Sequence, residues 1–137
     1  MGRISKEMII RKATIEDMEA LRLIYEEFLM ELDNTPDNEK IDITLKNCLE
    51  KGFISIAIDK KEIIAIAGGC FYGKIFHGNM IYIKPEYRNY LYKFLVYSLR
   101  EIKKEADCWQ MLCAPKRLKL WMKVGFDVDK VLIRRAL

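Results

Sequence analysis

The chain has 137 residues, of which 51% are hydrophobic and 32% are charged. These proportions are those of an ordinary globular domain, and the length suffices for one domain with a sizeable core. No apolar run is long enough to cross a bilayer, and the first residues lack the hydrophobic core of a signal peptide. We therefore expect one soluble, cytoplasmic domain over residues 1–137, with residues 1–7 as a frayed leader and no membrane partner.

The net charge of +4 is unevenly distributed along the sequence. Residues 1–83 hold 11 lysine and arginine residues against 14 acidic ones, whereas residues 84–137 hold 13 against 6. Because the basic residues are scattered rather than grouped with stacking aromatic residues, a nucleic-acid-binding module ranks only third among the functions considered. A basic second half suits the docking of a polyanionic cofactor.

We do not expect a metal site. The four cysteines show no paired ligand spacing and the chain has a single histidine, so a zinc ion would lack most of its usual ligands. We expect the cysteines to be reduced thiols, which is their usual state in the cytosol.

The first part of the sequence predicts a mixed succession of strands and helices. Thr14 begins a helix, because its hydroxyl can cap the first turn and Asp17 resembles the acidic residue of a capping box. Gly68 and Gly69 inside an apolar run predict a bulge or the close approach of another backbone. In chain order, the elements expected before residue 79 are a strand over Met8–Arg11, a helix from Thr14, a loop over 33–38, a shorter helix over 43–51, strands over 53–58 and 63–72, and a turn over 73–78.

The segment Asn79–Lys104 organises the rest of the chain. Met80–Ile83 is β-branched and aromatic, as in a buried strand, and Pro85 stops it because proline lacks a ladder donor. From Arg88 the apolar residues recur at helical spacing. A strand end that leads into a helix gathers free backbone amides at the positive end of the helix dipole, which suits phosphate. The elements expected after this segment are a strand over 108–113, a helix over 116–124 and a strand over 126–133.

Three segments resemble the GNAT superfamily of N-acetyltransferases, namely Ile9–Asp17, Tyr82–Arg88 and Leu120–Phe126. The middle segment, with its Pro-Glu-Tyr-Arg, is similar to the fourth strand and following turn of that family. In order along the chain, the three segments make the resemblance cover nearly the whole sequence. It implies an α/β (α+β) fold in the order β-α-α-β-β-β-α-β-α-β, with a mixed central sheet of about six to seven strands flanked by about four helices.

The resemblance implies an enzyme that transfers an acetyl group from acetyl-CoA to an amine of a small molecule or a protein. In the family, backbone amides of the fourth strand polarise the thioester, loop amides hold the pyrophosphate, and no metal is needed. The residues that match these positions, and that we predict to bind the cofactor, are Ile81, Tyr82, Ile83, Arg88, Asn89, Tyr90, Leu91, Tyr92, Lys93 and Trp121.

Several positions depart from the family's pattern. Leu91 and Lys93 stand where the loop has glycines, and a leucine restricts the approach of phosphate. Trp121 stands at the position of a tyrosine acid, and an indole N–H cannot protonate a thiolate. His77 and Asn79 stand where glutamates often serve the base, and a histidine titrates near neutrality, so both are candidate catalytic residues.

A second function therefore stays open, namely a catalytically degenerate protein that keeps the fold to bind a protein partner or to sense acyl-CoA. Ala114 favours this second function, because it stands where the family often has an asparagine that contacts the cofactor arm. The charge bias and the strand–helix junction favour the enzyme. The sequence does not identify the acceptor amine, and the resemblance leaves a homodimer open because dimers are frequent in the family.

Overall fold

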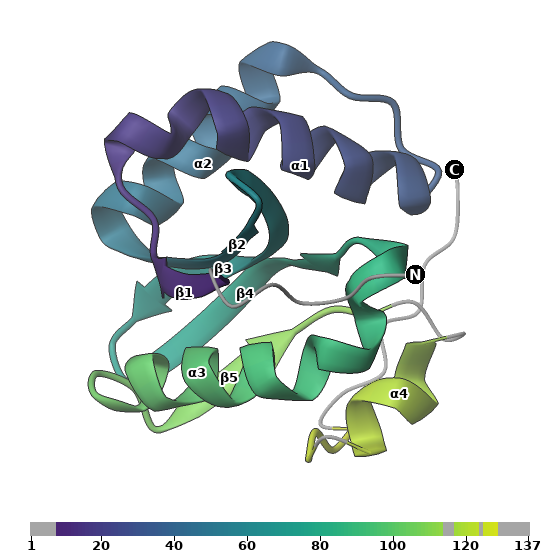
Figure 1. The fold of residues 1–137 in the computed structure, drawn as a ribbon. Helices are drawn as coiled ribbons and strands as arrows, with labels where there is room; N and C mark the ends of the chain where they lie inside the picture. The colour runs from purple at the N-terminus through teal and green to yellow at the C-terminus, as the bar shows by residue number, and fades with distance from the viewer. Residues whose placement is uncertain (1–7, 114–116, 124, 129–137) are drawn as a thin grey trace, which may run out of the picture.

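The computed structural model describes residues 8–113, 117–123 and 125–128. Within these residues the chain forms a five-stranded sheet with α1 and α2 over one face and α3 over the other (Figure 1). No helix in this part of the chain is long and apolar enough to span a bilayer. The elements are β1 (Ile9–Lys12), a 3₁₀ helix η1 (Ile15–Asp17), α1 (Met18–Glu31), α2 (Asn38–Lys51), β2 (Gly52–Asp59), β3 (Glu62–Tyr72), β4 (Ile75–Ile83), a 3₁₀ helix η2 (Pro85–Tyr90), α3 (Leu91–Lys103), β5 (Cys108–Met111) and α4 (Leu118–Lys123).

The strands lie in the order β1-β2-β3-β4-β5, which is also their order in the chain. The first three pairings are antiparallel, and β4 and β5 pair in parallel. Antiparallel neighbours need only short turns, whereas a parallel neighbour needs a crossover, which α3 provides here. The sheet is therefore mixed, as expected.

The expected count of six to seven strands is wrong for the described residues, which form five. One further strand was expected over 126–133. Residues 126–128 adopt no strand, and residues 129–133 lie outside the described residues, as do Ala114 and the leader 1–7. The strand expected over 108–113 ends at Met111, where it loses its partner on β4.

β4 is longer than the sequence pattern indicated. A turn was expected over residues 73–78, but the strand begins at Ile75 and the turn is confined to Gly73 and Lys74. Gly73 has φ of +60°, which lets the chain reverse within two residues. Phe76 is fully buried in the core under α3, and this burial holds the first residues of β4 against the sheet.

α2 also begins earlier than expected, at Asn38 rather than at residue 43. Asp37 is its N-cap, because one carboxylate oxygen accepts from the amides of Glu39 at 3.1 Å and Lys40 at 3.3 Å. The first turn therefore forms from polar residues before the apolar stripe begins.

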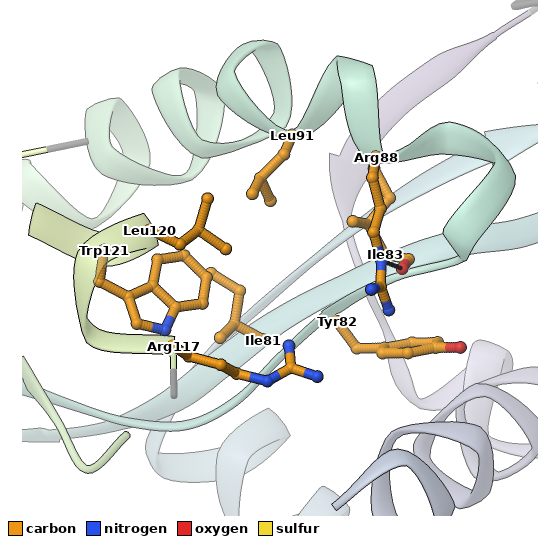
Figure 2. Close-up of a pocket in the computed structure, with 8 residues that line it drawn as sticks. All are labelled: Ile81, Tyr82, Ile83, Arg88, Leu91, Arg117, Leu120 and Trp121. Atoms are coloured by element: carbon orange, nitrogen blue, oxygen red, sulfur yellow. Dashed lines mark hydrogen bonds between the residues drawn. The ribbon is translucent and has the colours of Figure 1, made fainter. Parts of the chain in front are cut away.

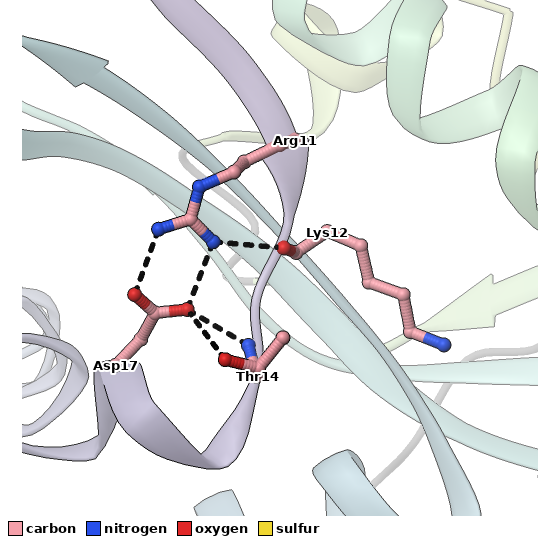
Figure 3. A network of polar contacts seen from close by, with 4 residues as sticks. All are labelled: Arg11, Lys12, Thr14 and Asp17. Atoms are coloured by element: carbon pink, nitrogen blue, oxygen red, sulfur yellow. Dashed lines mark hydrogen bonds and ion pairs between the residues drawn. The ribbon is translucent and has the colours of Figure 1, made fainter.

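The capping box predicted at the start of the first helical segment is confirmed (Figure 3). The Thr14 amide donates to Asp17 Oδ2 at 2.8 Å. Arg11 on β1 donates to both oxygens of the same carboxylate, at 2.8 and 2.9 Å. These hydrogen bonds, that from Arg11 foremost, hold the pKa of Asp17 below its usual value despite its partial burial. The network fixes the direction in which α1 leaves the sheet.

Candidate functional site

The free edge of β4 is the first feature of the candidate site. β4 pairs with β5 only from Ile75 to Gly78, which faces Met111. Beyond Gly78, β4 continues to Ile83 with β3 on one side and no strand of the described chain on the other. The two strands therefore part midway along β4, and one backbone edge of β4 has no strand beside it within the described residues.

A bulge lies where the strands part. The register between β3 and β4 shifts at Gly68 and Gly69, so that Asn79 has no partner on β3. A Cβ on Gly69 would lie 2.0 Å from the carbonyl oxygen of His77, so only glycine permits this approach of the two backbones. The prediction of a bulge at the two glycines is confirmed.

The open edge carries the backbone groups of Ile81 and Ile83. The Lys84 amide donates to the Ile64 carbonyl on β3 at 2.9 Å. A trans peptide holds its N–H and carbonyl on opposite sides, so the Ile83 carbonyl points away from β3, where Arg88 Nε donates to it at 3.2 Å. Because backbone groups alternate along a strand, those of Ile81 face the same edge.

A pocket of about 320 Å³, part of it open to solvent, lies beside this edge (Figure 2). β4 forms one side, the η2–α3 junction a second and the first turn of α4 a third. The lining residues are Ile81, Tyr82, Ile83, Arg88, Leu91, Arg117, Leu120 and Trp121. All of them except Arg117 and Leu120 are residues that the sequence predicted to bind a cofactor, so the fold brings these six together.

The loop expected after β4 is instead the 3₁₀ helix η2, which continues directly into α3. The Tyr87 amide donates to the Lys84 carbonyl at 2.9 Å, and the Leu91 amide donates to the Arg88 carbonyl. Because this segment contains no glycine, it readily adopts helical geometry and forms η2 in place of a loop. The α-helix itself starts at Leu91 rather than at Arg88. The two amides are already engaged and are not free to bind phosphate.

The remaining residues predicted to bind the cofactor lie outside the pocket lining. Asn89, Tyr92 and Lys93 are exposed, and Tyr90 is partly exposed. Leu91 does line the pocket, and its side chain projects from the wall that η2 and α3 form (Figure 2). This part of the site thus presents a leucine side chain, whereas the glycines of the family's pattern would leave the backbone accessible.

Glu31 joins the two arginines of the pocket. Arg88 Nη2 donates to Glu31 Oε2 at 2.6 Å, and Arg117 Nη2 donates to Glu31 Oε1. Burial raises the pKa of the Glu31 carboxyl, but the hydrogen bonds from the two guanidinium groups outweigh this effect and leave its pKa lowered. Arg88 also lies over the Tyr82 ring, with Cζ 5.9 Å from the ring centroid.

Sequence reasoning missed Glu31, Arg117 and Leu120. Glu31 lies 57 residues before Arg88 and 86 before Arg117, so no local spacing relates them. The only available signal was the position of Arg117 and Leu120 near Trp121, four residues and one residue before it on a predicted helix. That signal would have placed the three side chains near each other but not on a pocket.

The two candidate catalytic residues lie away from the pocket lining. His77 is on the part of β4 that still pairs with β5, opposite Gln110, and its ring lies 6.4 Å from that of Tyr72. Ile81 lies four positions further along the strand, which corresponds to about 13 Å. Asn79 lies nearer, at the bulge, and its amide donates to the Sγ of Cys48 at 3.4 Å.

Cys48, on the buried face of α2, is a core thiol rather than a nucleophile. Its burial, foremost, raises its pKa to about 12, although the hydrogen bond from Asn79 opposes the shift. Cys70 lies beside it, with the two sulfur atoms 3.9 Å apart. All four cysteines are free, and no group of residues in the described chain has the composition of a metal site.

Comparison with solved structures identifies the class of fold, which is that of the GNAT acetyltransferases. A predicted acetyltransferase of Clostridium acetobutylicum, solved with acetyl-CoA, aligns with a TM-score of 0.77 and 21% identity, over 93% of this chain and 96% of that one. AAC(6')-Iy, solved with a bisubstrate analogue that contains CoA, gives a TM-score of 0.74 and 17% identity, over 96% and 99% of the two chains.

A protein of Pyrococcus horikoshii taken to be an acetyltransferase gives a TM-score of 0.75 and 21% identity. The alignment covers 94% of this chain but only 46% of that one, so the chain spans about half of that neighbour. No protein-family model and no curated protein matches the sequence. At these identities the likeness establishes the fold, and the chemistry has to be argued from the site.

Proposed function

We propose that this protein is an N-acetyltransferase that moves the acetyl group of acetyl-CoA to an amine of a small molecule or a protein. The observation that carries the proposal is the open backbone edge at Ile81 and Ile83 beside a pocket at the parting of β4 and β5. Solved neighbours of the same fold, aligned over nearly the whole of this chain, hold acetyl-CoA or a CoA analogue.

The residues of the pocket suit the acyl end and the adjoining arm of such a donor. The N–H groups of Ile81 and Ile83 and the carbonyl of Ile81 could bond to amide and thioester groups, whereas the Ile83 carbonyl already accepts from Arg88. Fixed N–H donors stabilise the charge that develops on a carbonyl oxygen during acyl transfer. Leu91, Leu120 and Trp121 provide an apolar wall for the methylene groups of the arm. When bound, acetyl-CoA supplies the activated acyl group.

The diphosphate of the donor would be held differently from the family's pattern. The Leu91 amide is engaged in η2, so we propose that side-chain charge takes over from backbone amides. Lys93 supplies this charge from the exposed side of α3, with Asn89, Tyr90 and Tyr92 as flanking contacts. Salt should therefore weaken donor binding more than it would for a site made of backbone amides.

The proposed reaction needs two proton transfers, one from the acceptor ammonium and one to the leaving thiolate, and few side chains take part in them. The attacking ammonium must first lose a proton, which we assign to water positioned by His77 and Asn79, since His77 is too far along the strand to reach the amine directly. The new N–C bond forms as the C–S bond breaks, and the sulfur leaves as a thiolate. Trp121 cannot protonate that thiolate, so the proton comes from solvent.

Calorimetry with acetyl-CoA tests this proposal. We expect micromolar binding that Lys93→Ala weakens about tenfold through loss of one charge-assisted contact. Arg100→Ala is the matched control, because Arg100 is an exposed arginine on α3 outside the pocket lining. The absence of heat at high acetyl-CoA concentration would contradict the proposal and favour a partner-binding protein.

If acetyl-CoA binds, turnover separates an enzyme from an acyl-CoA sensor. Release of free thiol is measured with polyamines, peptides, amino acids and aminoglycosides as acceptors. Thiol release that depends on an acceptor supports the transferase, whereas binding without any acceptor-dependent release would leave only the sensor.

A further inference from the structure

Three charged side chains from distant parts of the chain meet at the mouth of the pocket. Glu31 is the last residue of α1, Arg88 belongs to η2, and Arg117 immediately precedes α4. Each guanidinium group donates to a different oxygen of the Glu31 carboxylate. The side chain of Glu31 is 22% exposed and that of Arg117 is 25% exposed, so these two are largely withdrawn from water, whereas the side chain of Arg88 is 43% exposed.

The cluster carries one positive charge in excess. Two guanidinium groups share one carboxylate, and the lowered pKa of Glu31 keeps that carboxylate ionised at neutral pH. The next acid on α1, Glu27, pairs instead with Lys84 at 3.5 Å. Among the described residues, Nη1 of Arg88 and both Nε and Nη1 of Arg117 have no hydrogen-bond acceptor. These donors and the uncompensated charge are suited to a further oxyanion.

The cluster lies on the side of β4 that faces α1. Tyr82 belongs to the core under α1 and α2, whereas Ile83 belongs to the core under α3. Both guanidinium groups point toward Tyr82, and Leu91, Leu120 and Trp121 gather on the opposite side of the pocket (Figure 2). The pocket therefore has an apolar end next to α3 and α4 and a cationic end next to α1.

We propose that the cationic end binds the carboxylate of the acceptor, so that the acceptor is a small amino acid rather than a polyamine or a neutral amine. This inference rests on the proposed acetyl transfer, in which the apolar end holds the arm of the donor. One carboxylate beside Glu31 brings the two arginines to charge balance, whereas a phosphate dianion would leave an excess negative charge. A polycation would meet a site of its own sign.

The chemistry of transfer leaves the carboxylate unchanged. The acceptor amine forms the N–C bond, the thioester C–S bond breaks, and the amine proton passes to water. The two arginines act by holding the acid group, which orients the neighbouring amine toward the free edge at Ile81 and Ile83.

Matched acceptor pairs test the inference. Thiol release is measured with amino acids and with the amides of the same amino acids, and the KM of each acid is compared with that of its amide. We expect the acid to have the lower KM, and we expect Arg117→Met to reduce this preference at least tenfold. Lys119→Met is the control, because it removes an exposed positive charge from the first turn of α4, two residues after Arg117.

Glu31→Gln distinguishes recognition from a merely structural role of the cluster. This variant removes the competing negative charge but keeps an oxygen for one guanidinium, so we expect a lower KM for amino acids and no such change for their amides. If the cluster only held α1 and α4 together, both KM values would rise. Arg117→Lys, with the melting temperature measured alongside, shows whether Arg117→Met acts through folding.

The outcomes separate this inference from the proposed function. Equal use of acids and amides, or a preference for polyamines or for phosphate-bearing amines, would overturn the inference and leave the transferase intact. If acetyl-CoA does not bind, the acid site is tested by titrating the protein with N-acetyl amino acids and with their amides, followed by NMR. Tighter binding of the N-acetyl amino acid than of its amide, with this difference lost in Arg117→Met, supports the site. Equal binding of the N-acetyl amino acid and its amide overturns it.

Discussion

Replacing Gly78 with alanine tests how the wall of the pocket is held against the sheet. A Cβ on Gly78 would lie 2.5 Å from Nε1 of Trp109 and 3.4 Å from two more ring atoms, so the indole has to move. Trp109 has little room, because its ring lies edge-on to Phe76 at 5.6 Å and to Phe126 at 5.5 Å. Phe126 in turn lies 6.1 Å from Trp121, which lines the pocket. The added methyl group therefore pushes on a series of rings that ends at the pocket.

The magnitude follows from two opposing effects. Overpacking of a filled site costs about 1–3 kcal/mol, and removing a glycine from a strand returns about 0.5–1 kcal/mol. We expect Gly78→Ala to lower the free energy of unfolding by about 1–2 kcal/mol, which corresponds to a melting temperature lower by about 3–6 °C for a domain of this size.

Trp109→Phe should suppress the effect of Gly78→Ala. Phenylalanine removes the atom that the new methyl group meets, and it also removes an indole N–H that is buried without a hydrogen-bond acceptor among the described residues. A double-mutant cycle should therefore give a favourable coupling of about 1 kcal/mol between the two substitutions.

Urea denaturation and tryptophan emission measure these effects. The chain has two tryptophans, Trp109 and Trp121, and both belong to the affected series of rings, so we expect Gly78→Ala to shift the emission. Gly73→Ala is the control, because Gly73 has φ of +60° with open space around it, and its strain of about 1 kcal/mol should leave the emission unchanged. A Gly78→Ala protein with wild-type stability and emission would refute the packing described here.

Three further predictions concern pH, a buried carboxylate and the base. The pKa values of Asp17 and Glu31 are lowered by folding, so the stability that these carboxylates contribute is fully present above their usual pKa values of 3.8 and 4.5 and is lost as pH falls through the lower folded values. The acid-induced decline in melting temperature should therefore be smaller in Asp17→Asn and Glu31→Gln than in the wild type. Parallel declines would contradict this. Tyr87→Phe should destabilise the protein by about 1 kcal/mol in urea denaturation, because the Tyr87 hydroxyl donates to the buried Asp59 carboxylate at 2.8 Å, and no change would mean that water replaces the bond. His77→Ala should lower kcat by about tenfold or more at neutral pH, and a loss of less than about twofold would remove His77 as the group that positions the water.

Local features of the sequence were read correctly where one segment determines its own structure. The capping box of Thr14 and Asp17, the bulge at Gly68 and Gly69 and the order of helices and strands within the described residues are all confirmed. Each depends on residues within a few positions, or on backbone conformations that only glycine tolerates. The GNAT fold follows from that order and agrees with the solved neighbours.

Errors arose where the fate of a segment depends on its neighbours. The residues before Met80 look like a turn in isolation, yet they form a strand because β3 on one side and β5 on the other supply hydrogen-bond partners. Likewise, the segment after Pro85 resembles a phosphate-binding loop in its first residues but lacks the glycines, and it closes into a 3₁₀ helix that engages its own amides.

By itself, the sequence determined the order of helices and strands, because periodicity and turn chemistry are encoded locally. The resemblance of three segments to a known family indicated six of the eight residues that line the pocket. Only the tertiary structure decided the charge of the pocket. Glu31, Arg88 and Arg117 are separated by up to 86 residues, and their ion pairs exist because the end of α1, η2 and the residue before α4 converge beside β4. Side-chain charges act over a few ångströms of space rather than along the chain, so such a cluster can be recognised only once the chain is folded.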